Sequence, residues 1–419
     1  MEFKELDDIA FVKGGKRLPK GQMLVTYKTK HPYLRISDYD KKGKVDLKKI
    51  QYVKNETFEE IKNYIISKGD VFLSIVGTIG IVDYINDELD GASLTENAVK
   101  ITVKDNEKYN PIFLTYYLKS PSGQFEIHSR TVGTTQKKLA IKRIKKINVP
   151  VILLDKQKRI ASILSNLDSK IEINNKIISN LESQAQAIFK SWFVDFEPFQ
   201  DGDFVESELG MIPEGWEVKK VNEICDLKIG RTPPRKESEW FSLKEGVKWV
   251  SIKDLGLSQM YISEVTEYLT EESIEKFNIP IVEENTLLLS FKLTVGRIAI
   301  TTEKMCTNEA IAQFKDPLIS TLFLFYYFKN FKFETLGNTS SIGNAVNSKI
   351  IKNIEVLVPP EKIVLKVMKM IEPLSICIRN LLNQNTKLAE LRDALLPKLM
   401  AGEIDVSNIK IEGEEVKNE

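Results

Sequence analysis

The chain has 419 residues, of which 42% are hydrophobic and 28% charged, and its formal net charge at pH 7 is +1. This length allows two or three domains with their own cores, and the composition is that of a globular protein. No apolar run reaches the roughly 18–20 residues of a membrane span, and the first residues lack the apolar stretch of a signal peptide. The three cysteines lie far apart in the chain, which argues against a disulfide framework or a zinc site. We therefore expect a cytoplasmic protein with no membrane contact.

Charge is unevenly distributed along the chain. Residues 12–54 contain 13 basic and 3 acidic residues, and residues 130–146 contain seven basic residues and no acidic one. Residues 195–223 reverse the balance, with nine acidic and two basic residues. A phosphate backbone responds to local basic patches rather than to the total charge, so the first two segments favour nucleic-acid binding. Solvated faces in a Lys-rich chain would give the same pattern.

One short pattern occurs twice, as YLRISD at 33–38 and as WVSIKD at 249–254. The match extends in both directions and keeps its order over about 200 residues, which indicates a duplication of one unit. The matching stretches are FKELDDIAFVKGGKRLP (3–19) with VKKVNEICDLKIGRTPP (218–234), GDVFLSIVGTIGIV (69–82) with NTLLLSFKLTVGRI (285–298), and INVPV (147–151) with VLVPP (356–360).

Each copy begins with short apolar or alternating runs that predict strands, followed by one helical stretch, PIFLTYYLKS (111–120) or LISTLFLFYYFKN (318–330). A long helix follows, from about 155 to 193 in the first copy, with apolar positions spaced alternately four and three residues apart. This spacing is typical of a coiled-coil seam. Each seam carries one asparagine, Asn174 or Asn385, which we interpret as a device that sets helix register, although exposure to water is the alternative. Pro373 predicts a kink or a new helix start in the second copy.

The predicted fold class is α+β, with two pseudo-symmetric globular domains held apart by two long antiparallel coiled-coil helices. The predicted boundaries are residues 1–152 for the first globular domain, 153–197 for the first helical spacer, 198–358 for the second globular domain, 359–402 for the second helical spacer and 403–419 for a tail.

Three segments resemble signatures of the specificity subunit of Type I restriction–modification enzymes: AQAIFKSWFVDFEPF (185–199), SELGMIPEGWEVKKV (207–221) and LRDALLPKLMAGEIDV (391–406). The resemblance implies that the globular domains are target recognition domains that read a bipartite site in double-stranded DNA. It also implies docking of two methyltransferase (modification) subunits, to which restriction (motor-nuclease) subunits add. Such a subunit does no chemistry itself.

The residues agree with a non-catalytic subunit. The chain has no G-x-x-x-x-G-K-[ST] phosphate loop and no N/D-P-P-aromatic tetrad of an amino-methyltransferase, and it contains only two histidines. We therefore expect no catalytic residue, no cofactor and no metal. Two alternatives remain open: a non-DNA-binding coiled-coil scaffold protein, which the net charge near zero favours, and a stand-alone nuclease or methyltransferase, which the missing motifs oppose.

Polar and basic loops that follow the helical stretch of each copy are the predicted DNA contacts, because such side chains bind phosphates and base edges. The candidates are Arg130, Thr134, Thr135, Gln136 and Lys137 in the first copy, and Asn338, Thr339, Ser340, Ser341 and Asn344 in the second.

Apolar clusters at the ends of the long helices exceed what a two-helix seam can bury, and they predict a protein interface. The candidates for partner binding are Phe189, Trp192, Phe193, Leu395, Leu396 and Leu399. The alternative is that these side chains pack the helices against the globular domains of the same chain.

Overall fold

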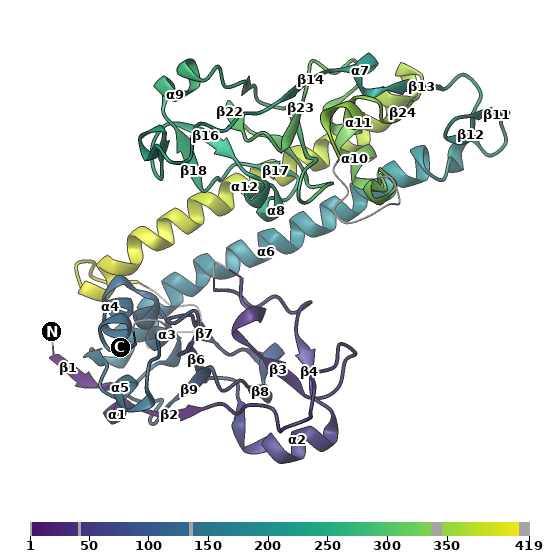
Figure 1. Ribbon diagram of the computed structural model, residues 1–419. Helices are drawn as coiled ribbons and strands as arrows, with labels where there is room; N and C mark the ends of the chain where they lie inside the picture. The colour runs from purple at the N-terminus through teal and green to yellow at the C-terminus, as the bar shows by residue number, and fades with distance from the viewer. Residues whose placement is uncertain (1, 41–42, 134–136, 337–345, 410–419) are drawn as a thin grey trace. The chain divides into compact units, whose positions relative to one another are not determined.

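A computed structural model describes residues 2–40, 43–133, 137–336 and 346–409. The chain divides into unit 1 (Met1–Ile173 and Asn385–Glu419) and unit 2 (Asn174–Gln384), and the fold class is α+β, as predicted. The two long helices are α6 (Leu154–Phe193) and α12 (Glu361–Ala401), and part of each helix belongs to unit 1 and the rest to unit 2 (Figure 1). Within the described ranges, no helix combines the length and apolar character needed to cross a bilayer.

Unit 1 is built from two small sheets and a separate strand pair. One sheet is antiparallel with the order β2-β9-β6-β7, the other has the order β4-β3-β8-β5 with β3 and β8 parallel, and β1 pairs with β10. Its strands are β1 (Glu2–Glu5), β2 (Ala10–Gly14), β3 (Pro32–Leu34), β4 (Gln51–Tyr52), β5 (Ile65–Ile66), β6 (Val71–Ser74), β7 (Val82–Tyr84), β8 (Ala92–Leu94), β9 (Ala98–Val103) and β10 (Asn148–Val151). Besides α6, its helices are α1 (Leu6–Ile9), α2 (Asn55–Ile61), α3 (Pro111–Lys119), α4 (Pro121–Ser129) and α5 (Ile141–Ile144).

Unit 2 repeats this plan with additions. Its sheets have the orders β14-β23-β20-β21-β17 and β15-β18-β16-β22-β19, β13 pairs with β24, and β11 and β12 form a hairpin. Its strands are β11 (Phe204–Ser207), β12 (Gly210–Pro213), β13 (Glu217–Lys220), β14 (Asp226–Ile229), β15 (Phe241–Ser242), β16 (Val247–Val250), β17 (Tyr261–Ile262), β18 (Glu267–Leu269), β19 (Ile281–Val282), β20 (Leu287–Ser290), β21 (Ile298–Thr301), β22 (Met305–Thr307), β23 (Ile311–Lys315) and β24 (Glu355–Val358). Besides α12, its helices are α7 (Val221–Ile224), α8 (Ile252–Leu257), α9 (Glu271–Lys276), α10 (Thr321–Asn330) and α11 (Ser348–Lys352).

The strand pairing corrects the sequence alignment at one point. In β1–β10 Glu2 pairs with Val151, and in β13–β24 Glu217 pairs with Val358, so Val151 is equivalent to Val358. The alignment of INVPV with VLVPP is therefore wrong by two residues. It superposes a proline in each segment, whereas the correct register superposes the buried isoleucines that precede each strand. In the corrected register Ile144 is equivalent to Ile351, and both are fully buried.

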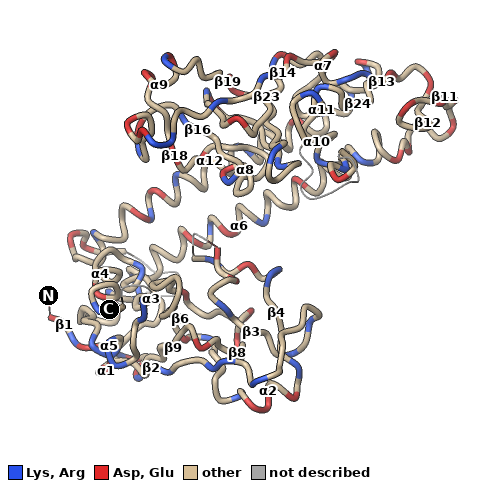
Figure 2. Tube along the Cα trace, viewed as in Figure 1, with Lys and Arg blue, Asp and Glu red and all other residues tan. Residues whose placement is uncertain are grey.

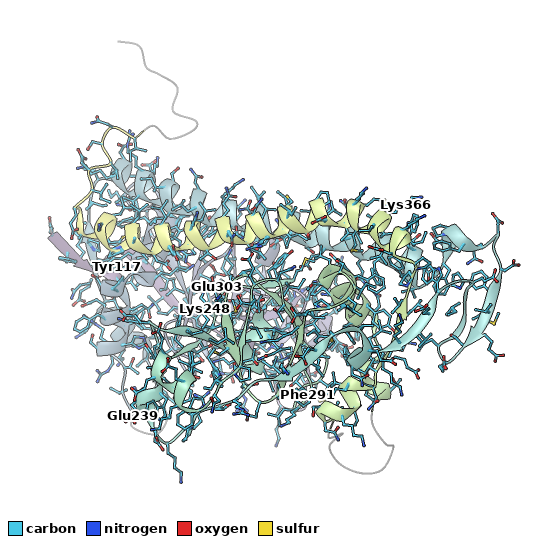
Figure 3. All side chains as sticks on the ribbon, turned by 90° about the horizontal axis from the view of Figure 1, so that it is seen from above. Tyr117, Glu239, Lys248, Phe291, Glu303 and Lys366 are labelled. Carbon is cyan, nitrogen blue, oxygen red and sulfur yellow. The ribbon has the colours of Figure 1, made fainter. Side chains whose placement is uncertain are left out.

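In unit 2 the second half of α6 runs antiparallel to the first half of α12. The Asn174 side chain donates a hydrogen bond to Gln384 (Nδ2–Oε1 2.8 Å), and further along the pair the Lys366 ammonium, labelled in Figure 3, lies 5.0 Å from the centre of the Trp192 ring. Asn174 is fully buried, as expected of a seam asparagine, whereas Asn385 is half-buried. The partner of Asn174 is a glutamine that the apolar spacing does not reveal.

Proline does not interrupt α12. The helix continues through Pro373, so the expectation of a new helix start there is wrong. Pro373 is exposed, while Ile371 and Ile378 on either side are fully buried in the core of unit 2. Burial of the flanking turns outweighs the roughly 3 kcal/mol that a proline costs inside a helix. Pro397 lies in the same helix, in unit 1.

In unit 1 a polar chain joins three helices. The Tyr116 hydroxyl of α3 donates a hydrogen bond to Asp168 of α6 (2.6 Å), and the Arg392 guanidinium of α12 contacts the other carboxylate oxygen (2.6 Å). Burial alone would raise the pKa of Asp168, but the hydrogen bonds from Tyr116 and Arg392 outweigh it and lower that pKa. The hydrogen bonds among Tyr116, Asp168 and Arg392 therefore fix the pairing of α6 with α12 in this unit, and they are charge-assisted and partly buried.

Candidate nucleic-acid interface

The repeated YLRISD and WVSIKD segments form a strand followed by a helical segment, which is a single 3-10 turn (Ile36–Asp38) in unit 1 and α8 in unit 2, and an aspartate caps the start of each. The Asp38 carboxylate accepts hydrogen bonds from the Arg35 backbone N–H (2.8 Å) and guanidinium (2.7 Å). The Asp254 carboxylate accepts from the Ser251 N–H (2.9 Å) and hydroxyl (2.6 Å). Both aspartates are buried. Their hydrogen bonds hold this segment in the same way in both units.

A glycine lets the loop after β2 lie directly against the end of β8. A Cβ on Gly15 would come within 2.1 Å of the Thr95 carbonyl oxygen, and the Lys16 N–H donates to the Leu94 oxygen (2.8 Å). A Cβ on the equivalent Gly230 in unit 2 would likewise come within 2.2 Å of the Thr307 carbonyl oxygen. No other residue type fits such a contact, so the loop position is set by the same device in both units.

In unit 1 this loop borders an open groove of about 820 Å³. Tyr33 is buried at the groove, and its hydroxyl donates to the Lys16 oxygen (2.9 Å). Basic and amide side chains line it: Arg17, Lys20, Arg35, Gln22 and Asn97. Arg17 has 85% of its side chain exposed, and its guanidinium lies 3.7 Å from the carboxylate of Glu96, which also lines the groove. Cationic and amide donors around an aromatic floor are the chemistry that binds phosphates and base edges.

In the same region of unit 2 an arginine contacts two aromatic rings and a carboxylate. The Arg235 guanidinium lies over Phe241 (4.3 Å) and Trp249 (4.4 Å) and is paired with Glu267 (2.8 Å). Trp249 is equivalent to Tyr33, and its indole N–H donates to the Arg231 oxygen (3.2 Å). The cation is therefore held by cation–π contacts with two rings and by a carboxylate.

A second loop in each unit follows the central strand β6 or β20. The Ser74 hydroxyl donates to the Thr78 oxygen (2.6 Å) and accepts from the Ile81 N–H (2.8 Å). Ser290 makes the same two bonds, to the Thr294 oxygen (2.6 Å) and from the Arg297 N–H (3.0 Å). Both serines are fully buried, so the hydrogen bonds that close each loop lie on its buried side.

In unit 1 the second loop lies against the basic segment 130–146. Val76 forms a bridge with Lys138, and the Leu139 N–H donates to the Ile75 oxygen (3.0 Å). Figure 2 shows basic residues gathered near α5, which lies in this segment. The segment is therefore not a loop throughout, because Ile141–Ile144 forms a helical turn. Its exposed basic side chains are Lys137, Lys138, Lys142, Arg143 and Lys146.

Of the predicted DNA contacts, Arg130 and Lys137 lie within the described residues. The Arg130 guanidinium pairs with Glu126 (2.8 Å) and donates to the Lys146 oxygen (3.0 Å), which ties α4 to the segment before β10. Lys137 is exposed beside the second loop. The other candidates lie outside the described residues: Thr134, Thr135, Gln136, Asn338, Thr339, Ser340, Ser341 and Asn344.

The predicted partner-binding residues are less exposed than the sequence suggested. Phe189 and Phe193 are buried in the core of unit 2, where both rings pack on Phe323 at centroid distances of 5.3 and 5.0 Å. Leu399 is buried in the core of unit 1. The expectation that these three are exposed is wrong, because the globular domains cover the helix ends. Trp192, Leu395 and Leu396 are half-buried.

Among the described residues, no group of three or more His, Cys, Asp or Glu side chains is placed to hold a metal ion.

Two curated relatives and one solved structure resemble the chain over most of its length. It is 26% identical to the Type I restriction enzyme MjaIX specificity subunit of Methanocaldococcus jannaschii, covering 85% of this chain and 82% of that protein. It is 24% identical to the Type I restriction enzyme HindI specificity subunit of Haemophilus influenzae, covering 81% and 87%. The crystal structure of the S subunit of a Type I restriction–modification system from M. genitalium has the same fold, with a TM-score of 0.57 at 17% identity and 95% of each chain covered.

The family described as Type I restriction modification DNA specificity domain matches residues 1–183 and again 213–391. The two matches follow the duplication seen in the sequence and in the sheet orders. The resemblance noted from the three sequence segments is confirmed, and the chain belongs to the family of Type I restriction modification DNA specificity domains.

Proposed function

We propose that this chain is the subunit that selects the DNA target of a Type I restriction–modification complex, and that each unit reads one half of a bipartite site in double-stranded DNA. The observation that carries the proposal is the repetition of one scaffold with different loops. Gly15 and Gly230, and Ser74 and Ser290, hold equivalent loops in place, while the side chains presented by those loops differ. Two scaffolds with different loops suit two half-sites of different sequence.

Exchange of one unit tests this proposal. Residues 1–150 are replaced by the corresponding segment of another family member, and the chimaera is combined with the methyltransferase subunit. The methylated adenines are then mapped by single-molecule sequencing. Only one half of the motif should change, because unit 2 keeps its own loops. A change in both halves, or in neither, would contradict the division of labour.

Salt dependence separates DNA recognition from a scaffold role. Release of counterions predicts that the affinity for the target duplex falls steeply as salt rises, with a slope near −0.9 per neutralised phosphate. A scaffold that does not bind DNA would show no such binding at any salt concentration. Glu206 lies in the acidic hairpin β11–β12, outside the loops that we expect to contact DNA. The control variant Glu206→Gln should therefore leave the salt slope unchanged.

We further propose that the long helices dock two methyltransferase subunits, to which restriction subunits add. Among the predicted contacts, Trp192, Leu395 and Leu396 keep part of their surface exposed. Leu396→Asp should reduce co-purification with the methyltransferase while circular dichroism stays unchanged, and Trp192→Ala should do the same. Full co-purification after both substitutions would assign these side chains to packing within the chain.

A further inference from the structure

The second loop of unit 2 carries a leucine in an unfavourable backbone conformation. Leu293 has φ +61°, and the Thr294 N–H donates to the Lys292 oxygen across it (2.6 Å). A hydrogen bond from residue i+2 to residue i with positive φ at the centre is the rare, strained form of the γ-turn. Glycine or asparagine adopts positive φ far more readily than leucine.

The equivalent residue in unit 1 is Gly77, with φ +77°. Ser74 and Ser290 close the two loops with the same pair of hydrogen bonds, so the backbone has the same path in both units. The backbone therefore requires positive φ at this position, and unit 1 meets that requirement with glycine. Unit 2 places a large apolar side chain there instead.

Packing does not explain the leucine. Leu293 is 97% exposed. The comparison within unit 2 is Phe196, another bulky residue at positive φ (+54°), whose ring packs on Trp216 at 5.4 Å and on Phe204 at 6.0 Å. Aromatic packing offsets the strain at Phe196, whereas Leu293 has no comparable burial in the described chain. Backbone strain that no packing interaction offsets is a feature of functional positions.

The base of this loop is anchored in unit 2. Phe291 at its base is buried, as labelled in Figure 3, and its N–H donates to the Ala310 oxygen (2.9 Å). Lys292 and Thr294, on either side of the leucine, are exposed. In unit 1 the equivalent loop lies beside the basic segment through the Val76–Lys138 bridge. An apolar tip between a cation and a hydroxyl suits a DNA groove, where lysine and threonine bind phosphates and an apolar group contacts the bases.

We propose that Leu293 makes an apolar contact with bases of the half-site that unit 2 reads, and that it contributes to sequence specificity there. This inference rests on the proposed DNA recognition. Two contacts share this chemistry: the C5-methyl group of a thymine in the major groove, and insertion between two base pairs from the minor groove.

The first experiment measures affinity and stability of two variants. Leu293→Gly and Leu293→Asn both accept positive φ and remove the apolar side chain. In the full chain combined with its methyltransferase subunit, each should weaken binding to the target duplex by roughly tenfold. Binding to a scrambled duplex and the melting temperature should not fall, because the substitutions relieve strain. Leu318→Ala, which removes another exposed leucine of unit 2 (80% exposed), is the matched control and should leave affinity unchanged.

The second experiment identifies the contact. Thymines of the half-site are replaced one at a time by uracil, which removes only the methyl group. Loss of affinity at one position for the wild type, and not for Leu293→Gly, would assign a methyl contact. In separate duplexes 2-aminopurine replaces single adenines, and a fluorescence rise on binding of the wild type alone would assign insertion between base pairs.

Several outcomes would overturn the inference while leaving the proposed function intact. The wild type would bind its target with the expected salt dependence, but the Leu293 variants would bind equally well. Equal losses on target and scrambled duplexes would indicate a general phosphate effect and would also overturn it. So would a specific loss of affinity that neither the uracil nor the 2-aminopurine duplexes can locate. Failure of the wild type to bind any duplex would instead contradict the proposed function itself.

Discussion

Around α3 in unit 1 and α10 in unit 2, equivalent positions differ in charge although the strands around them have the same order. Asp83, Asp168 and Arg392 of unit 1 correspond to Ala299, Ser375 and Ala185 of unit 2. Both units keep the tyrosine that joins this helix to the last strand: Tyr117 donates to the Asn148 oxygen (2.5 Å) and Tyr327 to the Glu355 oxygen (3.0 Å).

This difference in charge shows which contacts the shared backbone needs and which side chains can vary between the two units. Contacts that set the backbone are the same in both units: the close approach of Gly15 and Gly230, and the loop closures of Ser74 and Ser290. The ion pair Asp168–Arg392, whose members lie on different helices, has been lost as a pair, because a charge without its partner is costly when partly buried. Tyr116 and Lys119 of α3 are kept in unit 2 as Tyr326 and Lys329, although their carboxylate partners are not. Four predictions test this distinction.

The largest effect is expected at the glycines. Gly15→Ala and Gly230→Ala should each destabilise their own unit by about 3 kcal/mol or more, because the new Cβ would overlap backbone atoms that cannot move aside. All four tryptophans lie in unit 2, so urea denaturation followed by tryptophan fluorescence reports on Gly230→Ala, and hydrogen exchange reports on Gly15→Ala.

The neighbouring Gly14 is the control for this prediction. A Cβ there would meet the Ile141 Cδ1 atom at 3.4 Å, an ordinary contact. Gly14→Ala should change stability by less than about 1 kcal/mol. Equal effects at Gly14 and Gly15 would show that the close approach is not what restricts the position.

The second effect is specific to unit 1. Arg392→Ala should destabilise it by roughly 1.5–3 kcal/mol, because the partly buried Asp168 loses a charge-assisted hydrogen bond. In the wild type the lowered pKa of Asp168 contributes stability that is present above the ordinary carboxyl pKa and lost as pH falls through the lowered value. The variant should lose less stability on acidification.

A double-mutant cycle with Asp168→Asn isolates the pair. The coupling between Asp168 and Arg392 should be favourable and larger in magnitude than that of the exposed pair Lys62–Glu59, whose ion-pair distance is 2.7 Å. Coupling no larger than that of the surface pair would mean that the polar chain adds nothing specific to unit 1.

The third prediction removes the charge at Asp83, a position at which unit 2 has the uncharged Ala299. Burial raises the pKa of this carboxyl to about 6, although Lys119 at 3.8 Å acts in the opposite direction. Because the folded value lies above the ordinary one, the wild type loses stability as pH rises through about 6. Asp83→Asn should remove that loss and raise the free energy of unfolding at pH 7 by about 1–2 kcal/mol.

Urea midpoints at pH 5, 6, 7 and 8 check this prediction. The difference between variant and wild type should grow across the series and level off above pH 7. A difference that is constant with pH would mean that Asp83 does not titrate in this range.

The fourth effect, of about the same size as the third, should be equal in the two units. Ser74→Ala and Ser290→Ala each remove two hydrogen bonds from a buried loop closure, and each should cost about 1–2 kcal/mol. The Ser74 hydroxyl accepts a hydrogen bond from the Ile81 N–H, and the Ser290 hydroxyl accepts one from the Arg297 N–H. Hydrogen exchange at these two amides provides the local readout. Faster exchange in only one unit would show that the two loops are not held in the same way.

The sequence by itself determined the duplication, the α+β class, the long helices and the family. These follow from periodicity and from residues repeated in order, such as Gly15 and Gly230, because local backbone requirements leave a visible mark on residue choice. The buried Asn174 was also predictable from its place in the apolar seam. The exposed Leu293 was visible as a mismatch with Gly77, but the sequence does not show that the backbone there requires positive φ.

Only the tertiary structure decided which residues meet. Phe189, Phe193 and Leu399 looked like an exposed surface because helix spacing reveals one partner helix and not the domain that covers it. Pro373 stays in a helix because the turns on either side are buried, and the proline rule is local. The chain Tyr116–Asp168–Arg392 joins residues more than 200 positions apart, and no local pattern encodes such a contact. Its energy depends on burial, which exists only once the helices are packed.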